Sequence, residues 1–152
     1  MEIEKKYLVE KILFDLNNFT CKKIVQSYIS TDPVIRIRQY SNSYFLTIKG
    51  EGHIIREEFE MEISKKQYEN LLNKTENNSI LKTRYFINIE NNLVAELDIY
   101  EGHLKGLMTV EVEFPTEKKL LSFRPPNWFG KDVSQDKHYK NNYLSKYGIL
   151  KK

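Results

Sequence analysis

The segment Arg56-Glu57-Glu58-Phe59-Glu60-Met61-Glu62-Ile63 alternates charged and apolar side chains from Glu58 onward. Successive residues of a β-strand point to opposite faces, so the segment predicts a strand with one acidic face and one apolar face. One pattern of this kind is typical of an ordinary surface strand. This pattern recurs along the chain, and the recurrence needs an explanation.

Further stretches place charged residues at alternate positions, with both signs of charge represented. They are Glu2/Glu4/Lys6, Arg36/Arg38, Thr47/Lys49, Lys82/Arg84, Glu96/Asp98 and Glu111/Glu113. The positions between them are largely apolar, as in Val110, Val112 and Phe114.

Alternation and a high content of β-branched and aromatic residues predict eight strands. They are residues 2–9, 23–30, 34–40, 43–49, 54–63, 80–89, 92–100 and 107–114. Ser41-Asn42 and Asn91-Asn92 are typical of tight hairpin turns, because Asn tolerates positive φ. Short connections favour antiparallel neighbours, and eight such strands are enough to close a barrel.

Helix signals interrupt these strands. Ser64 and Gln67 form a capping-box pattern that predicts a helix over 65–74, and Thr116 predicts a short one over 117–123. Ser134 is expected to cap a final helix that runs to about Tyr147 and stops at Gly148. Residues 11–20 are expected to contain a short helical turn.

The overall composition indicates one domain over residues 1–152, with 40% hydrophobic and 30% charged residues. A net charge of +3 is too small to indicate a nucleic-acid polymer as partner. The single cysteine, Cys21, excludes an internal disulfide and favours a reducing compartment. The chain opens on a charged strand and has no membrane-length apolar run, so we expect a cytoplasmic protein.

The alternation alone leaves two arrangements open. A conventional barrel would place the apolar faces in its interior and the charges in water. An inverted barrel would enclose the charges and cover its apolar outer faces with helices and loops. In the inverted case, arginine and lysine would suit a phosphate chain, and clustered carboxylates would need hard divalent cations such as Mg²⁺ or Mn²⁺ to bridge them to phosphate.

Glu2-Ile3-Glu4-Lys5-Lys6 resembles the N-terminal ExExK signature of the CYTH superfamily, the triphosphate tunnel metalloenzymes. The resemblance continues in order through Ile35–Arg38, Leu46–Gly50, Arg56–Glu60, Lys82–Tyr85, Glu96–Gly102 and Glu111–Glu113. It extends to the patterns over 128–134 and 139–142, and is strongest to the short bacterial inorganic triphosphatases.

This resemblance implies a mainly β fold: an eight-stranded antiparallel closed barrel, or tunnel, with a charged lumen and a few helices packed outside. It implies triphosphate binding by Lys6, Arg36, Arg38, Lys49, Arg56, Lys82 and Arg84. It implies metal binding by Glu2, Glu4, Glu58, Glu60, Asp98, Glu111 and Glu113, with two Mg²⁺ or Mn²⁺ ions. Catalytic candidates are Glu4, Glu60, Lys6 and Lys82, either lysine being able to protonate the leaving oxygen.

The expected reaction is metal-dependent hydrolysis of inorganic tripolyphosphate to pyrophosphate and phosphate. A class IV-type adenylate cyclase and a nucleoside or thiamine triphosphatase are alternatives on the same fold. A non-catalytic polyphosphate-binding barrel is the alternative from another class. The expected partner is thus an inorganic or organic triphosphate. No membrane association is expected, and a homodimer is possible.

Some positions stay undecided from the sequence. Glu62 and Glu96 fit the charged pattern but could lie at a tunnel mouth. Tyr28 is equally consistent with a position in the lumen and with a packing role outside it. His53 and His138 are expected at the surface.

Overall fold

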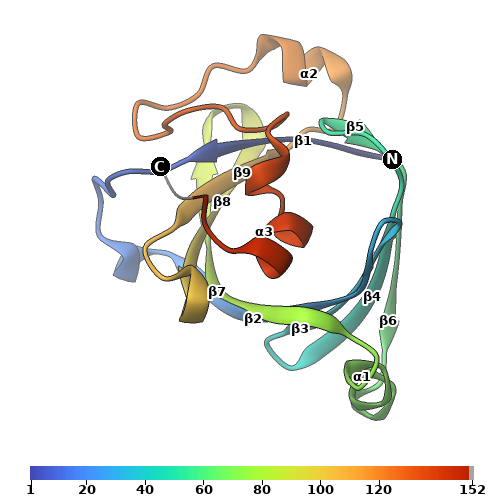
Figure 1. Ribbon diagram of the computed structural model, residues 1–152. Helices are drawn as coiled ribbons and strands as arrows, with labels where there is room; N and C mark the ends of the chain where they lie inside the picture. The colour runs from blue at the N-terminus through green and yellow to red at the C-terminus, as the bar shows by residue number, and fades with distance from the viewer. Residues whose placement is uncertain (151–152) are drawn as a thin grey trace.

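The computed structural model describes residues 1–150, and these residues form an antiparallel sheet of nine strands curled into a barrel (Figure 1). The predicted domain also includes residues 151–152, which lie outside the described residues. The strands are β1 (Glu2–Leu8), β2 (Thr20–Thr31), β3 (Val34–Tyr40), β4 (Ser43–Lys49), β5 (Ile55–Arg56), β6 (Glu58–Ile63), β7 (Glu76–Ile89), β8 (Leu93–Glu101) and β9 (Met108–Glu113). Their order in the sheet is β5-β1-β9-β8-β7-β2-β3-β4-β6.

The predicted mainly β, antiparallel barrel is confirmed, and the count differs because one predicted strand is two. The segment 54–63 breaks at Glu57 into β5, which pairs with β1, and β6, which pairs with β4. The Glu57 carbonyl accepts a hydrogen bond from Gly50 N at 2.9 Å, in register with the β4–β6 pairing. One stretch of chain therefore joins the two ends of the sheet and closes the barrel.

The barrel is inverted: its apolar faces point outward. Ala95, Leu97, Val110 and Val112 are fully buried on the outer face of β8 and β9, beneath the segments 12–19 and 114–129. A second apolar cluster, around Ile37 and Ile63, lies beneath α1. The hydrophobic core therefore lies on the outside of the sheet, over β8 and β9 and beneath α1, whereas Phe59 and Met61 on β6 stay exposed. The charged faces of the strands point inward.

Three α-helices lie outside the sheet: α1 (Lys65–Leu72), α2 (Glu117–Ser122) and α3 (Asn141–Tyr147). The capping box predicted for α1 is present, because Ser64 Oγ accepts from Gln67 N at 3.1 Å and Gln67 Oε1 accepts from Ser64 N at 2.9 Å. Short 3₁₀ turns cover Leu16–Asn18, Glu90–Asn92, Gly102–Leu104 and Lys137–Tyr139. The first of these is the turn expected within residues 11–20.

The prediction that Ser134 caps the final helix is wrong. The cap position of α3 is Lys140, whose side chain makes no capping hydrogen bond. Ser134 instead accepts a hydrogen bond from Lys6 N at 2.9 Å, so its hydroxyl is occupied by β1. Between Ser134 and α3 the chain forms only the 3₁₀ turn Lys137–Tyr139 and no continuous helix.

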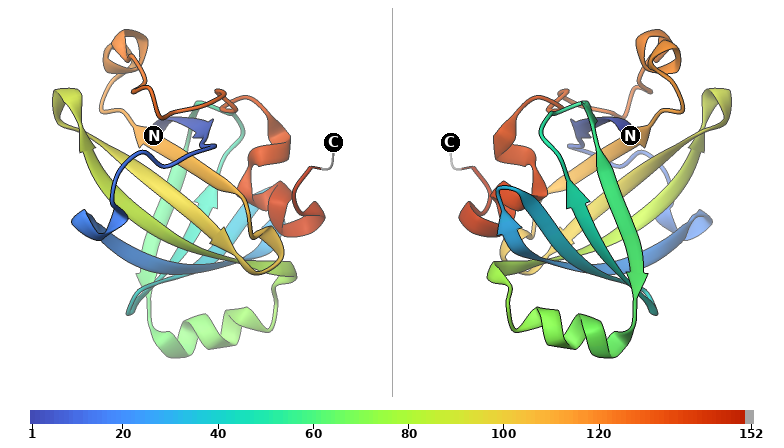
Figure 2. Two further views of the ribbon diagram at one scale, coloured as in Figure 1. Left: turned by 90° about the vertical axis from the view of Figure 1, so that its left-hand side faces the viewer. Right: turned by 90° about the vertical axis from the view of Figure 1, so that its right-hand side faces the viewer.

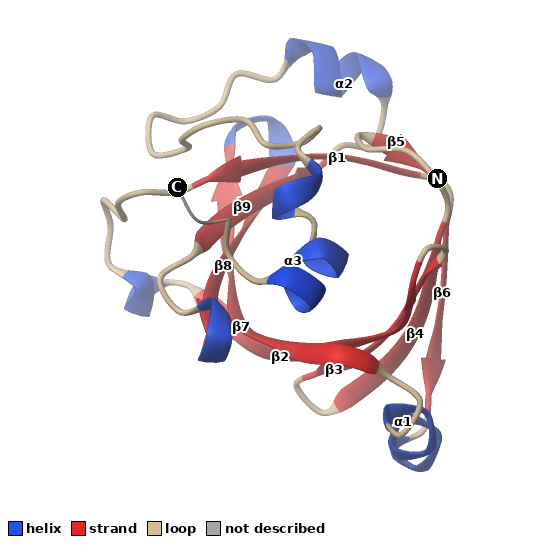
Figure 3. Cartoon of the chain, in the orientation of Figure 1, coloured by secondary structure: helices blue, strands red, loops and turns tan. Residues whose placement is uncertain are grey.

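Helix α3 covers one opening of the barrel, whereas α1 and α2 lie along its outside (Figures 1 and 2). Leu144 is fully buried against Tyr28, Ile80 and Tyr100, and Ser145 Oγ donates to the Asn78 carbonyl at 2.6 Å. Figure 3 shows that this is the place where helix and loop, rather than strand, face the barrel axis. None of the helices within residues 1–150 is long and apolar enough to cross a membrane.

Leu144→Ala should lower the free energy of unfolding by about 2–5 kcal/mol, because it opens a cavity beneath α3. Leu121→Ala is a matched control on α2, since Leu121 is 83% exposed. Chemical denaturation of both variants checks this, and equal losses of stability would contradict the packing described.

Candidate active site

The barrel encloses a polar cavity of about 320 Å³, and each of the nine strands contributes to its lining. Its charged lining residues are Glu2, Glu4, Lys6, Arg36, Arg38, Lys49, Arg56, Glu58, Glu60, Lys82, Arg84, Glu96, Glu111, Glu113 and Lys140. Strand register explains why opposite charges meet there. Lys6 is the cross-strand partner of Glu111, Glu2 of Arg56, and Lys49 of Glu58.

One wall combines arginines with Glu60. Glu60 Oε2 lies 3.4 Å from Arg38 Nη2 and 3.9 Å from Arg36 Nη2, and it accepts a hydrogen bond from Thr47 at 2.7 Å. Burial, followed by the charges of Arg36 and Arg84, lowers the pKa of Arg38 to about 10. In the described part of the chain, the buried Nε atoms of Arg36, Arg38 and Arg56 have no hydrogen-bond partner. These guanidinium donors suit anionic oxygens.

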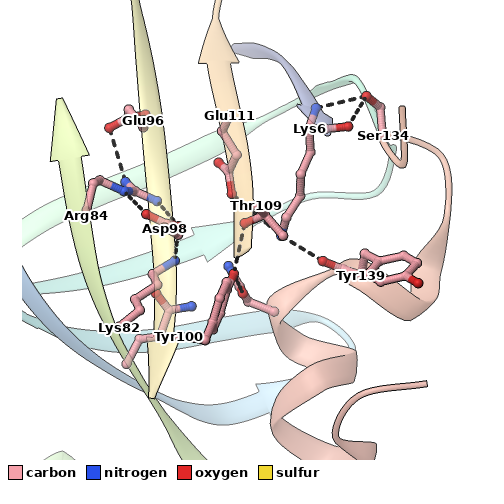
Figure 4. A network of polar contacts seen from close by, with 12 residues as sticks. Lys6, Lys82, Arg84, Glu96, Asp98, Tyr100, Thr109, Glu111, Ser134 and Tyr139 are labelled. Atoms are coloured by element: carbon pink, nitrogen blue, oxygen red, sulfur yellow. Dashed lines mark hydrogen bonds and ion pairs between the residues drawn. The ribbon is translucent and has the colours of Figure 1, made fainter. Parts of the chain in front are cut away.

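Opposite them, Asp98 holds Lys82 and Arg84 together (Figure 4). Its oxygens lie 2.8 Å from Lys82 Nζ, 2.8 Å from Arg84 Nε and 2.9 Å from Arg84 Nη2. Burial opposes ionisation of Asp98, but Arg84 and Lys82 outweigh it and lower its pKa. Asp98 is 0% exposed and does not line the cavity. The buried Asp98 carboxylate thus orients Lys82 and Arg84, which line the cavity, without lining the cavity itself.

Lys82 is the more unusual of these cations. Burial lowers the pKa of its ammonium to about 8, although Asp98 acts in the opposite direction. Arg84 also donates to Glu96 at 3.2 Å, which holds the guanidinium on a second side.

Lys6 links the cavity to the C-terminal segment. Its ammonium lies 3.6 Å from Glu111 and donates to the Tyr139 carbonyl at 2.7 Å (Figure 4). Burial raises the pKa of Glu111, but the charges of Lys6, Arg84 and Lys82 outweigh it and hold the pKa well below its usual value. Glu111 is therefore ionised.

Other carboxyl groups crowd one another. Burial, then the Glu111 charge, raises the pKa of Glu4 to about 8. A hydrogen bond with Glu2, then burial, raises the pKa of Glu58 to about 7. Lys49 Nζ lies 3.0 Å from Glu2 and 3.7 Å from Glu58, and so compensates only part of this charge.

The donor set fits a hard divalent cation. Carboxylate oxygens are the ligands that Mg²⁺ and Mn²⁺ prefer, and a bound cation would stabilise the ionised carboxylates against burial and mutual repulsion. Over residues 1–150, no three His, Cys, Asp or Glu side chains are arranged as a complete metal-binding cluster. Carboxylates from β1, β6 and β9 instead face a shared space, in which phosphate oxygens and water could complete a coordination shell.

The cavity brings together all seven predicted phosphate-binding cations and every predicted metal-binding carboxylate except Asp98. Tyr28 and Glu96 also line it, whereas Glu62 and His138 do not. His138 pairs with Asp136 at 2.7 Å.

The sequence analysis missed several lining residues: His53, Tyr40, Phe45, Ser134, Lys140, Asn141 and Asn142. Tyr40 and Phe45 continue the inward parity of β3 and β4, so that parity was the available signal. Residues from Ser134 onward had no strand parity. Ser134 and residues 140–142 fall in the patterns over 128–134 and 139–142 that belong to the resemblance, but their place at the cavity follows from the folded path of the C-terminal segment.

Asp98→Asn should destabilise the protein by about 3–5 kcal/mol at pH 7, because it leaves two buried cations without their shared anion. The pKa of Asp98 is lowered in the folded state, so its contribution is present above its ordinary pKa and lost as the pH falls. The difference between the variant and the unmodified protein should therefore shrink in acid. Unfolding curves from pH 7 down to pH 3 measure it. Glu101→Gln, which changes an exposed acid on the same strand, should show neither effect.

Comparisons with known proteins agree with this geometry. The CYTH domain model matches residues 1–124. An inorganic triphosphatase from Nitrosomonas europaea is 41% identical over 147 residues, covering 95% of this chain and 96% of the relative. An inorganic triphosphatase from Acetivibrio thermocellus is 33% identical over 151 residues, covering 95% and 93%.

Solved structures show the same similarity. A crystal structure of an inorganic triphosphatase has a TM-score of 0.69 and 38% identity, covering 95% of this chain and 94% of the other. A Hippeastrum protein named as an adenylyl cyclase with a dominant triphosphatase activity has a TM-score of 0.63 and covers 80% and 83%, but its 17% identity shows the fold alone. The charged cavity, the match over residues 1–124 and the two relatives establish that the chain belongs to the CYTH family.

Proposed function

We propose that this protein hydrolyses inorganic tripolyphosphate to pyrophosphate and phosphate inside the barrel. The observation that carries the proposal is an enclosed cavity in which seven cations predicted to bind phosphate face a group of under-compensated carboxylates. The inorganic triphosphatases similar to this chain support the choice of substrate. The cytoplasmic location inferred from the sequence stays a prediction.

The seven cations bind the substrate in this proposal. The unpartnered Nε atoms of Arg36, Arg38 and Arg56 would donate to phosphate oxygens, and Lys49 and Lys6 would compensate the remaining charge. Phosphoryl transfer depends on such positioning and charge neutralisation more than on covalent chemistry by the protein. Asp98 and Glu96 keep the opposite wall in place by fixing Arg84.

CYTH family membership implies a divalent metal. We propose Mg²⁺ or Mn²⁺, two ions in all, held by Glu2, Glu4, Glu58, Glu60, Glu111 and Glu113. When bound, a divalent cation neutralises phosphate oxygens and lowers the pKa of water. Asp98, predicted from the resemblance as a metal ligand, is assigned to positioning instead, because Lys82 and Arg84 already engage both of its oxygens.

Hydrolysis adds water to a terminal phosphorus, breaks the bridging P–O bond and leaves an oxygen that needs a proton. Lys82 suits that donation, because a pKa of about 8 makes its ammonium a stronger acid than an ordinary lysine while keeping it charged at neutral pH. We assign Lys6, whose ammonium lies 3.6 Å from Glu111 and donates to the Tyr139 carbonyl, to substrate binding. Glu4 and Glu60 are the candidate acceptors for the proton of water.

An organic triphosphatase is the second candidate, because aromatic residues line the cavity. Tyr40 and Phe45 lie edge to face, with ring centroids 6.3 Å apart. Lys22 and Arg38 already lie over the Tyr40 ring, at 4.8 and 5.1 Å, which leaves it less free to stack on a base. Inorganic triphosphate therefore remains the preferred substrate. The several carboxylates in the cavity would not help a protein that only binds polyphosphate. No observation specifically supports adenylate cyclisation.

Phosphate release should be fastest with tripolyphosphate in a panel that includes pyrophosphate, ATP and thiamine triphosphate, each with Mg²⁺ or Mn²⁺. Activity should disappear with EDTA and return on addition of excess metal. Faster release from ATP or thiamine triphosphate would favour the second candidate. Activity that survives EDTA would contradict the metal assignment.

Glu4→Gln should lower kcat by about 100-fold or more, the range expected when an acid–base or metal-binding group is lost, with a smaller effect on KM. Arg56→Ala should instead raise KM by about tenfold or more, since it removes a charged donor worth about 1.5–3 kcal/mol. Glu62→Gln is the control, because Glu62 is exposed and outside the cavity. Full activity of Glu4→Gln at limiting metal would refute its assigned role.

A further inference from the structure

Thr47 is a neutral residue at a position where the alternating pattern of the sequence otherwise places charge. It is 0% exposed on β4 and does not line the cavity, although Arg36 on β3 and Glu60 on β6 both do. The strand register places Thr47 between these two residues, as the cross-strand partner of each. A buried hydroxyl needs a hydrogen-bond partner, and the partner of Thr47 indicates its role.

The hydroxyl of Thr47 is committed to Glu60. Thr47 Oγ1 donates to Glu60 Oε2 at 2.7 Å, and an ionised carboxylate can only accept such a bond. Because the threonine side chain is β-branched, its χ1 angle is restricted, and the backbone of β4 largely fixes where the hydroxyl lies. Glu60 is therefore held by a stiff side chain on the neighbouring strand.

The two carboxylates that face arginines in this barrel contact them differently. Asp98 forms a fork with Arg84, in which the nitrogen–oxygen distances are 2.8 and 2.9 Å. Glu60 stays 3.4 Å from Arg38 Nη2 and 3.9 Å from Arg36 Nη2, and its closest oxygen to both is Oε2. Hydrogen bonds between a guanidinium and a carboxylate are typically about 2.7–2.9 Å long, so Glu60 forms no such fork.

The loose contacts leave hydrogen-bond donors available on the arginines. Within residues 1–150, the buried Nε atoms of Arg36 and Arg38 have no partner, and both side chains line the cavity. A carboxylate that closed a fork on either guanidinium would occupy donors that an anionic ligand needs. Glu60 is close enough to Arg38 to do this, and the bond from Thr47 opposes the movement.

We propose that Thr47 is a positioning residue that holds Glu60 Oε2 and thereby keeps this carboxylate from closing on the two arginines beside it. The arginines then stay open to a phosphate chain. Glu60 Oε1, which accepts no hydrogen bond from the described residues, stays free for the roles proposed above. The inference rests on the proposed function for the identity of the ligand, and it adds a residue that keeps the binding site open.

Calorimetric titration of tripolyphosphate into the full-length protein, with EDTA present, measures substrate binding separately from metal binding. Thr47→Val removes the hydroxyl and keeps a β-branched side chain of similar size. It should weaken tripolyphosphate binding by about threefold to tenfold, the range that one hydrogen bond supplies. Thr47→Ser restores the donor and should bind nearly as tightly as the unmodified protein.

A double-mutant cycle with Glu60→Gln separates positioning from packing. Glutamine is neutral and cannot hold an arginine as an ion pair does, so Thr47→Val should cause no further loss of affinity in that background. A purely structural role of Thr47 would weaken binding equally in both backgrounds. Glu60→Gln alone should bind tripolyphosphate at least as tightly as the unmodified protein, because a competing negative charge is removed.

Thr109→Val is the matched control. Thr109 is also 0% exposed, but its hydroxyl pairs with Tyr100 at 3.5 Å instead of with a carboxylate. Its loss should leave the affinity for tripolyphosphate unchanged. If Thr47→Val fails to fold, Thr47→Ala in both Glu60 backgrounds gives the same comparison.

The possible failures are distinguishable. Equal weakening by Thr47→Val in both backgrounds, no weakening at all, or a Thr47→Ser variant as weak as Thr47→Val overturns this inference alone. Tight binding of tripolyphosphate without hydrolysis in the presence of Mg²⁺ or Mn²⁺ overturns the proposed function, while the cycle still decides the role of Thr47. Absence of binding to the unmodified protein overturns both.

Discussion

Enclosing many charges in a β-barrel is possible here because the strand register and side-chain ion pairs bring many of them next to a charge of opposite sign. An isolated buried charge costs several kcal/mol even after relaxation. Lys6 opposite Glu111 and Arg84 opposite Asp98 show how the ladder itself brings compensating groups together. The apolar clusters outside the barrel stabilise the fold, so the interior is free to be polar.

The charge pairing inside the barrel is incomplete, and the uncompensated groups indicate which ligands the cavity would bind. Around Arg36, Arg38 and Arg56, donors outnumber acceptors. In contrast, burial and then the Glu111 charge raise the pKa of Glu4, while a hydrogen bond with Glu2 and then burial raise the pKa of Glu58. A phosphate chain alone would worsen the second imbalance, and a metal ion alone would worsen the first. Both together neutralise the interior, which is the charge pattern expected of a site for a metal-bound polyanion.

The strands and their inward residues could be predicted because alternation is a local property of the chain. Alternation could not show which face of the strands lines the barrel interior, because a conventional and an inverted barrel have the same alternation of charged and apolar residues. The family resemblance carried by Glu2–Lys6 and the later motifs resolved this question. The helix cap at Ser134 was mispredicted because a distant backbone, Lys6 N, competes for the hydroxyl. Asp98 follows the charged parity, but parity cannot tell a carboxylate that faces the cavity from one enclosed by its neighbours. Lys140 falls in the 139–142 pattern of the resemblance, but its place in the cavity lining depends on the path of the C-terminal segment.

Because the chain breaks at Glu57, ion pairs contribute to the closure of the barrel. β5 joins β1 through two residue pairs, and Glu2 contacts groups on both sides of the break. It lies 3.7 Å from Arg56, and it shares Lys49 with Glu58, because Lys49 Nζ lies 3.0 Å from Glu2 and 3.7 Å from Glu58. The Glu2 carboxylate therefore helps to hold together an edge of the sheet where the backbone pairing is short. Neutralising Glu2 would weaken its ion pair with Arg56 and leave the short β5–β1 pairing to hold this edge of the barrel.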